Sequence, residues 1–413
     1  MKTLVIGTGG REHALALALS RDPNVTEVHA APGNPGIGRV ATLHDVDPMD
    51  GPAVAALARE LGADLVVVGP EAPLVAGVAD AARVAGISCF GPTAEAARIE
   101  GSKAFAKEVM AAAGVPTAEA RVCESEEHAA AALDEFGAPY VVKDDGLAGG
   151  KGVVVTEDRE AALQHAKACG RVLIEEYLDG PEVSLFAITD GETVRPLQPA
   201  QDFKRAYDGD AGPNTGGMGA YTPLPWAPAD LVDQVTAQVL EPTVREMAGR
   251  GTPFQGLLYA GLALTSRGVR VVEFNARFGD PETQALLQRL DSPLGVLLKA
   301  AADGRLGEVE PPRWRGGAAV AVVLAADGYP ESPRKGDPIT GVEDAEALDG
   351  VDVVHAGTGL VDGALVTAGG RVLAVTAVGD DVVDARRRAY EGVGLIRFDG
   401  AHHRTDIAAE VAP

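Results

Sequence analysis

Val271-Val272-Glu273-Phe274-Asn275-Ala276-Arg277-Phe278 is the stretch of sequence that decides most about the fold. Side chains of a strand alternate between two faces, so this pattern predicts a strand with one polar and one apolar face. The polar face carries Val271, Glu273, Asn275 and Arg277, and the apolar face carries Val272, Phe274, Ala276 and Phe278. A carboxylate and an amide oxygen suit a cation such as Mg²⁺, and a guanidinium suits an anion beside it. The stretch therefore predicts a metal and phosphate site. The alternative is an edge strand with a solvated polar face.

The length and composition are those of a globular α/β protein of about three domains. No apolar run reaches the roughly 20 residues of a membrane helix, and Met1 to Gly7 resembles a strand rather than a signal peptide. We therefore expect a cytoplasmic protein that does not bind membranes. Cys89, Cys123 and Cys169 lack CxxC spacing, which indicates neither a disulfide framework nor a zinc site.

The formal net charge of −24 argues against nucleic-acid binding, because a polyanion is held chiefly by clustered Lys and Arg. Only nine of the 36 basic residues are Lys. An anionic substrate needs local positive charge against such a repulsive field. Lys103, Lys143 and Lys151, which lie in or beside Gly-rich segments, are the candidates to supply it.

The first hundred residues alternate short apolar runs with helical patterns, which predicts βαβ units around a parallel sheet. The runs are Leu4–Ile6, Glu12–Ser20, Glu27–Ala31, Val54–Leu61 and Leu65–Val68. The turn Gly7–Glu12 follows a strand and opens a helix, a geometry that suits an anion. Glu12 stands where a dinucleotide fingerprint has its third Gly, and no acidic residue follows the second strand, so a phosphate or phosphosugar is favoured over NAD. The alternative is a turn needed only for tight packing.

The middle of the chain predicts two further units. Ser102 is a candidate N-cap for a helix over Lys103–Ala113, which begins the second domain. A small α/β module follows, with strands at 140–143, 153–155 and 172–177 and a helix ending near Ala168. Beyond it we expect longer strands, a polar loop over 201–221 and a helix over 229–249. The tail predicts strands at 319–325 and 371–378 and a helix near 384–393.

The loop Lys143-Asp144-Asp145-Gly146-Leu147-Ala148-Gly149-Gly150-Lys151-Gly152 lies between two of these strands. Its glycines allow backbone amides to approach phosphate oxygens, and its two lysines can neutralise them. The spacing is not that of a Walker A loop. A flexible surface hairpin would explain the glycines but not the flanking lysines, so the loop predicts phosphate binding, with Asp144 directed to solvent.

This loop, the strand end EEYLDG and the later EFN resemble the ATP-grasp superfamily. The ordered motifs GTGGREHA, VGPEAPLVAGV, EGSKAFAK, DGLAGGKG, QDFKR, GPNTGGMGAY, EFNARFGDPETQ and HAGT resemble the phosphoribosylamine–glycine ligase family over nearly the whole chain. The resemblance implies an α/β and α+β fold in three parts. These are a Rossmann-like parallel-sheet domain (1–102), an ATP-grasp domain (103–310) with a small lid (about 115–180), and a C-terminal α+β domain (311–413).

The resemblance also implies site residues. Metal ligands are Glu273 and Asn275, and catalytic residues are Arg277, Asp202 and Asp280. ATP would contact Lys103, Lys143, Gly149, Gly150, Lys151, Glu175, Glu176, Tyr177, Leu178 and Glu182. The phosphoribosyl and glycine substrates would contact Gly9, Gly10, Arg11, Asn34, Pro70, Glu71, Asn214, Thr215, Gly216, Gly217 and Met218.

The activity implied is the ATP-dependent ligation of glycine to 5-phosphoribosylamine, through a glycyl phosphate, by a monomer that uses Mg²⁺ or Mn²⁺. Phosphorylation is needed because a carboxylate lacks a usable leaving group, and phosphoryl transfer depends chiefly on alignment and charge neutralisation. One alternative is another ATP-grasp carboxylate–amine ligase. The other is a nucleotide-binding regulator without catalysis, against which the complete metal and lysine set argues.

Overall fold

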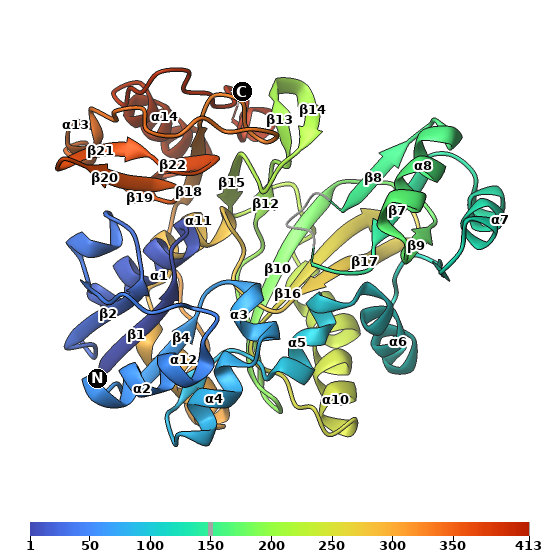
Figure 1. The fold of residues 1–413 in the computed structure, drawn as a ribbon, viewed down its shortest axis with the longest axis horizontal. Helices are drawn as coiled ribbons and strands as arrows, with labels where there is room; N and C mark the ends of the chain where they lie inside the picture. Colours follow the sequence, from blue (N-terminus) through green and yellow to red (C-terminus); the bar gives the residue numbers. More distant parts are fainter. Residues whose placement is uncertain (148–151, 413) are drawn as a thin grey trace.

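The computed structural model describes residues 1–147 and 152–412, so the predicted loop residues Gly149, Gly150 and Lys151 lie outside the described residues. Figure 1 shows residues 1–100 at the lower left, a separate lobe of residues 120–175 at the right, and the last hundred residues at the top. Within the described part of the chain, no helix combines the length and apolar character required to cross a membrane.

The N-terminal sheet is parallel and has the strand order β3-β2-β1-β4-β5, which confirms the predicted βαβ rhythm. Its strands are β1 (Lys2–Gly7), β2 (Glu27–Pro32), β3 (Thr42–Leu43), β4 (Leu65–Val68) and β5 (Cys89–Phe90). Its helices are α1 (Gly10–Ser20), α2 (Gly51–Leu61), α3 (Glu71–Val75), α4 (Val78–Val84) and α5 (Ala94–Gly101). The strand order reverses between β1 and β4, and ligands of open α/β sheets bind at the carboxyl ends of strands at such a point.

The lobe at the right of Figure 1 is an antiparallel sheet of order β6-β9-β7-β8 covered by two helices. Its elements are β6 (Ala120–Cys123), α7 (Glu126–Phe136), β7 (Tyr140–Asp144), β8 (Val153–Thr156), α8 (Arg159–Cys169) and β9 (Val172–Glu175). Leu133, Val142 and Ile174 belong to a core of its own, so the lobe is a separately packed module. Helix α6 (Lys103–Ala113) precedes it, and Ser102 Oγ accepts the Phe105 N–H at 3.2 Å, which confirms the predicted N-cap.

The central sheet is antiparallel and has the order β11-β10-β16-β17. Its strands are β10 (Glu182–Asp190), β11 (Val194–Pro196), β16 (Gln255–Thr265) and β17 (Gly268–Asn275). The helix predicted over 229–249 is a run of α9 (Leu231–Val235), a π turn (Thr236–Leu240) and α10 (Glu241–Gly249). After β17 come α11 (Glu282–Arg289) and α12 (Leu294–Ala302).

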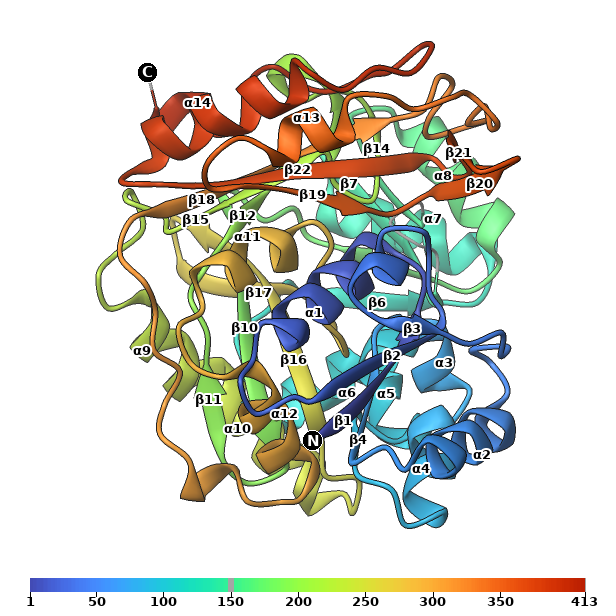
Figure 2. The ribbon, with the colours of Figure 1, turned by 90° about the vertical axis from the view of Figure 1, so that its left-hand side faces the viewer.

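The C-terminal sheet has the order β12-β15-β18-β22-β19 and lies above α1 and α11 in Figure 2. Its strands are β12 (Gln201–Asp202), β15 (Gly219–Thr222), β18 (Ala318–Ala325), β19 (Val351–His355) and β22 (Arg371–Gly379). Two hairpins extend from it, β13 (Arg205–Tyr207) with β14 (Ala211–Asn214) and β20 (Thr358–Val361) with β21 (Ala364–Thr367). Its helices are α13 (Val342–Glu346) and α14 (Val382–Val393). The sequence did not predict that β12 and β15 join this sheet, and the polar loop between them is therefore fixed by the C-terminal region.

The strand predicted over 271–278 is wrong in two details. It ends at Asn275, and Val272 is an extra residue, because Gly261 pairs with Glu273 while Leu262 pairs with Val271. A bulge shifts the faces of the strand, so Val271, predicted on the polar face, is buried in the same core as Phe274. Beyond the bulge the alternation holds, and Glu273 and Asn275 share the face opposite Phe274.

Candidate active site

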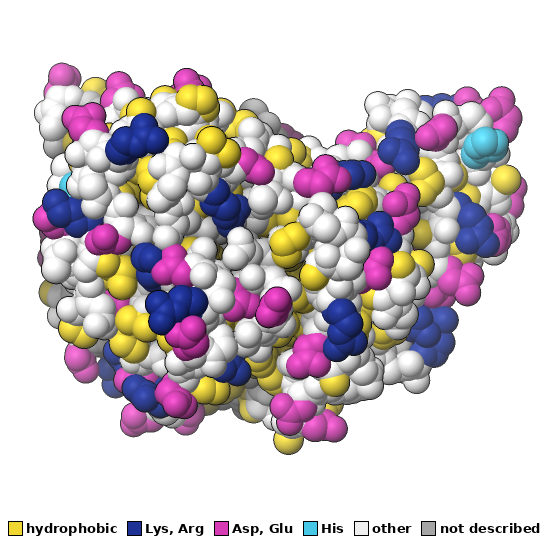
Figure 3. All heavy atoms as spheres, turned by 90° about the horizontal axis from the view of Figure 1, so that it is seen from below, with side chains coloured by type: hydrophobic (Ala, Val, Ile, Leu, Met, Phe, Trp, Pro, Cys, Tyr) yellow, Lys and Arg dark blue, Asp and Glu magenta, His cyan; other side chains and the backbone are white. Residues whose placement is uncertain are grey.

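The surface is hollowed between the main body and the lobe that carries α7 and α8, at the right of Figure 3. The strand β7 of the lobe meets β17 of the central sheet through Lys143, whose ammonium donates to the Val272 carbonyl at 2.9 Å. The bulge leaves Val272 outside the β16–β17 pairing, so its carbonyl is available for this contact. The lysine at the start of the Gly-rich loop is thereby held beside the strand that carries Glu273.

Glu175 joins two lysines at this contact. Its carboxylate lies 2.7 Å from Lys143 Nζ and 3.0 Å from Lys107 Nζ, and all three groups are largely buried. Burial raises the pKa of Glu175, but the two ammonium groups outweigh it and the pKa is lowered overall. Burial also lowers the pKa of both lysines. For Lys143 the carboxylates of Glu175 and Glu273 reverse this effect, whereas the pKa of Lys107, which also feels the charge of Lys143, stays below its usual value.

The Gly-rich loop is tied to α6 by its own residues. Lys103 Nζ donates to the Gly146 carbonyl at 2.9 Å. The Asp145 carboxylate accepts from Ser102 Oγ at 3.2 Å and from the Ala104 N–H at 3.1 Å, and pairs with Arg171 at 2.9 Å. The predicted solvent-facing Asp144 is half-buried at the end of β7. Lys103 thus reaches the loop from the N-terminus of α6. Its ammonium and the Ala104 N–H both donate to residues of the loop.

Glu273 differs from its charged neighbours because it has no partner. Within residues 1–147 and 152–412 its half-buried carboxylate makes no hydrogen bond or ion pair. On the same face, Asn275 is 7% exposed and its Oδ1 accepts from Arg277 Nη2 at 3.2 Å. A free carboxylate and an amide oxygen on one face form a hard oxygen pair of the kind that Mg²⁺ or Mn²⁺ accepts. Two protein ligands with substrate phosphates suffice for Mg²⁺, and no group of three or more His, Cys, Asp or Glu ligands occurs among the described residues.

The strand end beyond Glu175 lies at the edge of the cleft. The Glu176 N–H donates to the Glu119 carbonyl at 3.0 Å, and its carboxylate pairs with Arg267 at 2.8 Å. Tyr177 is exposed and Leu178 is half-buried. Glu182, at the start of β10, forms an ion pair with Lys204. The predicted ATP-binding strand end is therefore open at Tyr177 and Leu178, while the Glu175 and Glu182 carboxylates are held by lysines.

A second group of acidic side chains surrounds Ser184 of β10, in the central sheet. Ser184 Oγ contacts Asp202 Oδ1 at 3.5 Å, Glu282 Oε1 at 3.3 Å and the Tyr259 hydroxyl at 2.8 Å. Burial raises the pKa of Asp202 to about 7, against the opposing charge of Lys204 at 3.7 Å. A carboxyl with this pKa can exchange a proton near neutral pH, which suits a group that lines a reaction centre.

Arg277 lies beyond the end of β17 and is held by two carboxylates. Its guanidinium lies 3.0 Å from Glu100 Oε1 and 3.4 Å from Glu71 Oε2. Burial lowers its pKa, but Glu100 and Glu71 raise the pKa above the ordinary value of arginine. Arg11 Nη1 lies 3.9 Å from the same Glu71 carboxylate. Arg277 therefore links α3 and α5 of the N-terminal region to the end of β17. Glu100 was not predicted from the sequence.

Asp280 connects the N-terminal turn, the polar loop and the C-terminal sheet. Its carboxylate accepts the Arg11 N–H at 3.4 Å and pairs with Arg371 at 3.3 Å. Although burial raises the pKa of Asp280, Arg371 and Arg11 lower it overall. Arg371 also donates to the carbonyls of Gly216 and Asp280, both at 2.6 Å. Arg371, at the start of β22, is a functional candidate that no short motif indicated.

The predicted substrate loop 214–218 is folded against its surroundings. Thr215 accepts the Gly217 N–H at 3.0 Å, and Met218 is fully buried. Gly217 has φ +113°, and a Cβ there would lie 2.5 Å from Pro281, so only glycine fits. Asn214 and Gly216 are the loop members left nearest to solvent.

The N-terminal turn binds its own glutamate. Glu12 is 2% exposed, and its carboxylate accepts the Gly9 N–H at 2.6 Å and the Arg11 guanidinium Nη1–H at 3.3 Å. A Cβ at Gly7, Gly9 or Gly69 would collide with the Glu12 side chain, at 2.7, 2.7 and 2.1 Å. These glycines leave room for Glu12. The alternative that the glycines of this turn are needed only for tight packing thus accounts for them. Gly10 and Pro70 lie near the point between β1 and β4 at which the strand order reverses.

Asn34 is also fully engaged. Its amide donates to the Thr8 carbonyl at 2.7 Å and the His355 carbonyl at 3.0 Å, and its Oδ1 accepts the Ile37 N–H at 2.9 Å. His13 Nδ1 accepts the His355 N–H at 2.7 Å. Burial lowers the pKa of His13 to about 3 and that of His355 to about 4, so both rings are neutral. The HAGT segment, which begins at His355, is thereby held against the N-terminal region.

A lobe that carries lysines faces a central antiparallel sheet, and the strand β17 of that sheet bears a carboxylate and an amide side chain. This arrangement defines the class of ATP-grasp proteins. Models of the three parts of phosphoribosylglycinamide synthetase match the chain: the N domain at residues 1–100, the ATP-grasp (A) domain at 101–283 and the C domain at 319–410. The chain belongs to the phosphoribosylglycinamide synthetase, or phosphoribosylamine–glycine ligase, family.

Individual relatives agree over the full length. The phosphoribosylamine–glycine ligase of Streptomyces coelicolor is 68% identical, with 100% of each chain covered, and that of Mycobacterium leprae is 58% identical over 100% of this chain and 99% of the relative. The crystal structure of phosphoribosylamine–glycine ligase from Thermotoga maritima matches with a TM-score of 0.85 at 34% identity, covering 99% of this chain and 100% of that one. A biotin carboxylase domain from Hydrogenobacter thermophilus, at 19% identity and a TM-score of 0.72, shares the fold.

Proposed function

We propose that this chain joins glycine to 5-phosphoribosylamine with ATP, and releases glycinamide ribonucleotide, ADP and phosphate through a glycyl phosphate. The observation that carries the proposal is the meeting of β7 and β17, where Lys143 lies beside the unpartnered Glu273. Positive and negative groups that face one cleft from two sheets are what a nucleotide with a bound cation requires.

ATP would lie between the lobe and the central sheet. Lys103, Lys143 and Lys151 would neutralise its phosphates, and the backbone amides of Gly149 and Gly150 would approach the phosphate oxygens. Glu176, Tyr177, Leu178 and Glu182 would border the nucleoside. Glu175 would act by holding Lys143, and Lys107 by sharing that carboxylate. Because Glu175 is already bound to both lysines, the Lys143 ammonium has one fixed position before a phosphate arrives, which lowers the cost of ordering it.

Glu273 and Asn275 would hold Mg²⁺ or Mn²⁺. The positive charge supplied by this cation would offset the negative charge that develops on the phosphate oxygens. Glu273 fits this role since its carboxylate is half-buried, ionisable and unpartnered in the described chain, and Asn275 offers an oxygen on the same face.

The glycine carboxylate would attack the γ-phosphorus of ATP, and the amine of phosphoribosylamine would then displace phosphate from the glycyl phosphate. Arg277 would pair with the glycine carboxylate or the transferring phosphoryl group. Asp202, whose pKa of about 7 suits proton exchange, and Asp280 would line the reaction centre. Arg11, Glu71 and Asn214, with the backbone of Gly9, Gly10, Pro70 and Thr215–Met218, would surround the phosphoribosyl group, and Asn34 would hold the adjoining loops.

We further propose that the chain divides near residues 102 and 310, that the segment of about 115–180 closes over ATP to exclude water, and that the enzyme is a cytoplasmic monomer. The separate core of the lobe supports movement as a unit.

The test is a coupled assay for ADP, with phosphoribosylamine generated in situ because it is labile, and mass detection of the product. ADP release should require both glycine and phosphoribosylamine and should yield glycinamide ribonucleotide. Release with another carboxylate and amine would indicate a different ATP-grasp ligase. ATP binding without turnover in the presence of both substrates would indicate a nucleotide-binding regulator.

A further inference from the structure

Arg371, the first residue of β22, extends from the C-terminal sheet into the candidate active site. Its Nη1 donates to the carbonyls of Gly216 and Asp280, both at 2.6 Å, and its Nη2 lies 3.3 Å from Asp280 Oδ2. One planar guanidinium therefore joins the substrate loop 214–218 to the turn that leads into α11. Arg371 is not among the residues assigned to ATP, the metal or the substrates.

Gly216 is held by the C-terminal region at both its N–H and its carbonyl. The N–H donates to the Tyr329 hydroxyl at 3.0 Å, while the carbonyl accepts from Arg371. A Cβ at Gly216 would lie 3.0 Å from Arg371 Cζ. A Cβ at Gly370 would lie 2.3 Å from the Tyr329 ring. Because neither glycine has a Cβ, the two side chains approach the loop closely and fix the position of Gly216.

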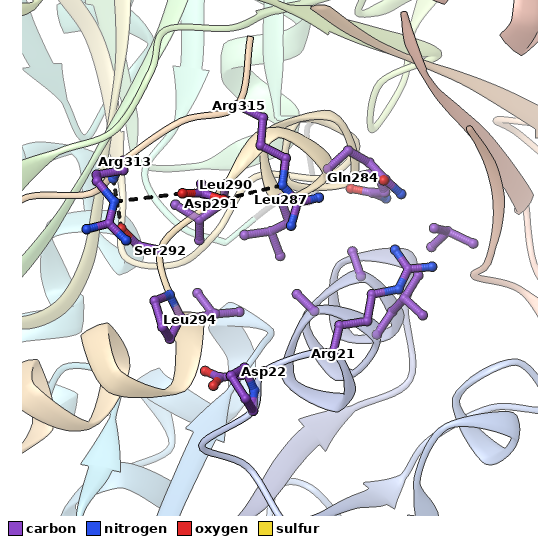
Figure 4. Close-up of a pocket in the computed structure, with 17 residues that line it drawn as sticks. Arg21, Asp22, Gln284, Leu287, Leu290, Asp291, Ser292, Leu294, Arg313 and Arg315 are labelled. Atoms are coloured by element: carbon purple, nitrogen blue, oxygen red, sulfur yellow. Dashed lines mark hydrogen bonds and ion pairs between the residues drawn. The ribbon is translucent and has the colours of Figure 1, made fainter. Parts of the chain in front are cut away.

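Asp280 extends this connection to α1 and α11. Its Oδ1 accepts from Gln284 Nε2 at 2.7 Å, and its Oδ2 accepts the Arg11 N–H at 3.4 Å. Figure 4 shows Gln284 with other residues of α11 and α1 that line one cavity, which places Asp280 close to the contact between these helices. The charge of Arg371 lowers the pKa of Asp280 against the effect of burial. An ionised carboxylate only accepts hydrogen bonds, so Asp280 suits hydroxyl and amine groups of a substrate.

The loop 214–218 is paired in turn with the segment that follows Asp202. The Thr215 N–H donates to the Lys204 carbonyl at 2.8 Å, and the Met218 N–H donates to the Phe203 carbonyl at 2.7 Å. The Lys204 ammonium lies 3.7 Å from the Asp202 carboxylate. A displacement of Gly216 would therefore be felt at both acidic residues of the proposed reaction centre.

We propose that Arg371 is a positioning residue for the ligation reaction, which fixes Gly216 relative to Asp280 and thereby shapes the part of the site that receives the phosphoribosyl group. The inference rests on the proposed function. The described contacts of the Arg371 side chain go to the substrate loop and to Asp280, whereas ATP would contact the lobe and β17. Loss of the guanidinium should therefore weaken phosphoribosyl binding and leave nucleotide binding unchanged.

The experiment is calorimetric titration of the full chain with glycinamide ribonucleotide, a stable probe for the phosphoribosyl site, and separately with ADP and Mg²⁺. The variants are Arg371→Lys and a matched control, Arg388→Lys. Arg388 also holds a backbone carbonyl and a carboxylate, those of Asp349 at 3.1 Å and Asp384 at 3.0 Å, and its partners lie outside the candidate site. The two arginine side chains are similarly exposed, at 21% and 26%.

Wild type and Arg388→Lys should bind glycinamide ribonucleotide equally. Arg371→Lys should bind it roughly tenfold more weakly, because lysine keeps the charge but loses the fork that spans two carbonyls. ADP should bind equally to all three proteins. A merely structural role would lower Tm or the number of binding-competent molecules, and it would leave the Kd of the folded fraction unchanged.

Tyr329→Phe tests the same loop residue from its other side and keeps the ring. Loss of the hydroxyl should weaken binding of glycinamide ribonucleotide by about threefold. In the double variant with Arg371→Lys, the loss should be smaller than the product of the two single losses, because both side chains hold Gly216.

Three results would overturn the proposal: unchanged affinity of Arg371→Lys for glycinamide ribonucleotide, an equal loss in Arg388→Lys, or an equal loss of affinity for ADP. If Arg371→Lys does not fold, wild-type affinity of Tyr329→Phe would overturn it in the same way. Wild-type protein that binds ADP but not glycinamide ribonucleotide would instead overturn the proposed function.

Discussion

Glu12, in the first turn of α1, and Glu273, near the end of β17, are both carboxylates that pack against glycines, yet their surroundings differ. Glu12 is 2% exposed, bound to the Gly9 N–H and to Arg11, and enclosed by Gly7, Gly9 and Gly69. Glu273 is half-buried, and it has no partner in the described chain. A carboxylate whose oxygens are already hydrogen-bonded maintains the shape of a loop, whereas an unpaired carboxylate in a cleft is available to a ligand. The comparison separates a residue that maintains a loop from one that is proposed to bind the metal ion.

The largest effect is expected for Glu273→Gln. Because the carboxylate makes no hydrogen bond or ion pair with a described residue, the substitution should lower kcat by about 10²–10³-fold with little change in Tm. Steady-state ADP release and a thermal melt measure the two quantities. A variant that melted early but turned over normally would assign Glu273 to stability and reverse the comparison.

Lys143→Met should come next. It removes the ammonium that would face the phosphates and leaves the buried Glu175 with Lys107 alone, so kcat/KM for ATP should fall by about 10²-fold with some loss of stability. Lys167→Met is the matched control, because Lys167 pairs with Glu126 on the lobe surface. Equal effects of the two substitutions would show that Lys143 does not contact ATP.

Glu12→Ala tests the other side of the comparison. The Gly9 N–H would lose its acceptor, so the free energy of unfolding should fall by about 1–3 kcal/mol. The KM for ATP of the folded fraction should not change. Urea unfolding and initial rates measure these effects, and the account of Glu12 fails if stability is retained and only the KM for phosphoribosylamine rises.

Arg277→Lys should have a smaller and more selective effect. A lysine retains the charge near Glu100 and Glu71 but loses the planar fork, so the KM for glycine should rise by roughly tenfold with little change in the KM for ATP. An unchanged dependence on glycine would discard the proposed role of Arg277.

The smallest effect is a change in pH dependence. Burial lowers the pKa of His13 from 6.5 to about 3, so the unfolded chain takes up the proton first as pH falls. The stability is fully present above pH 6.5 and is lost progressively on acidification toward the folded pKa. His13→Asn, which keeps an acceptor for the His355 N–H, should reduce the slope of unfolding free energy in this window by up to about 1.4 kcal/mol per pH unit. His128→Asn, on the surface of the lobe, should leave the slope unaltered; an effect equal to that of His13→Asn would contradict the assignment.

The sequence predicts those elements whose signal is local. The parallel N-terminal sheet follows from alternating apolar runs, and α6 from Ser102 and the helical pattern after it. The bulge at Val272 depends on pairing with β16, and the entry of β12 and β15 into the C-terminal sheet depends on contacts with β18, so neither is visible in local periodicity.

The candidate site shows the same limit. Glu273 and Asn275 could be placed on one face from spacing alone. The links from Glu175 to Lys107, from Arg277 to Glu100 and from Asp280 to Arg371 join residues far apart in the chain. Lys107 lies one helical turn after Lys103, which is the one local signal that could have indicated it.

The most direct test of the central claim, activation of glycine as an acyl phosphate, uses glycine labelled with oxygen-18 in its carboxylate. The phosphoryl group that joins the carboxylate leaves with one carboxylate oxygen when the amine attacks, so mass spectrometry should find one labelled oxygen in the released phosphate. Glycinamide ribonucleotide should retain the other. Unlabelled phosphate formed together with the product would contradict the account.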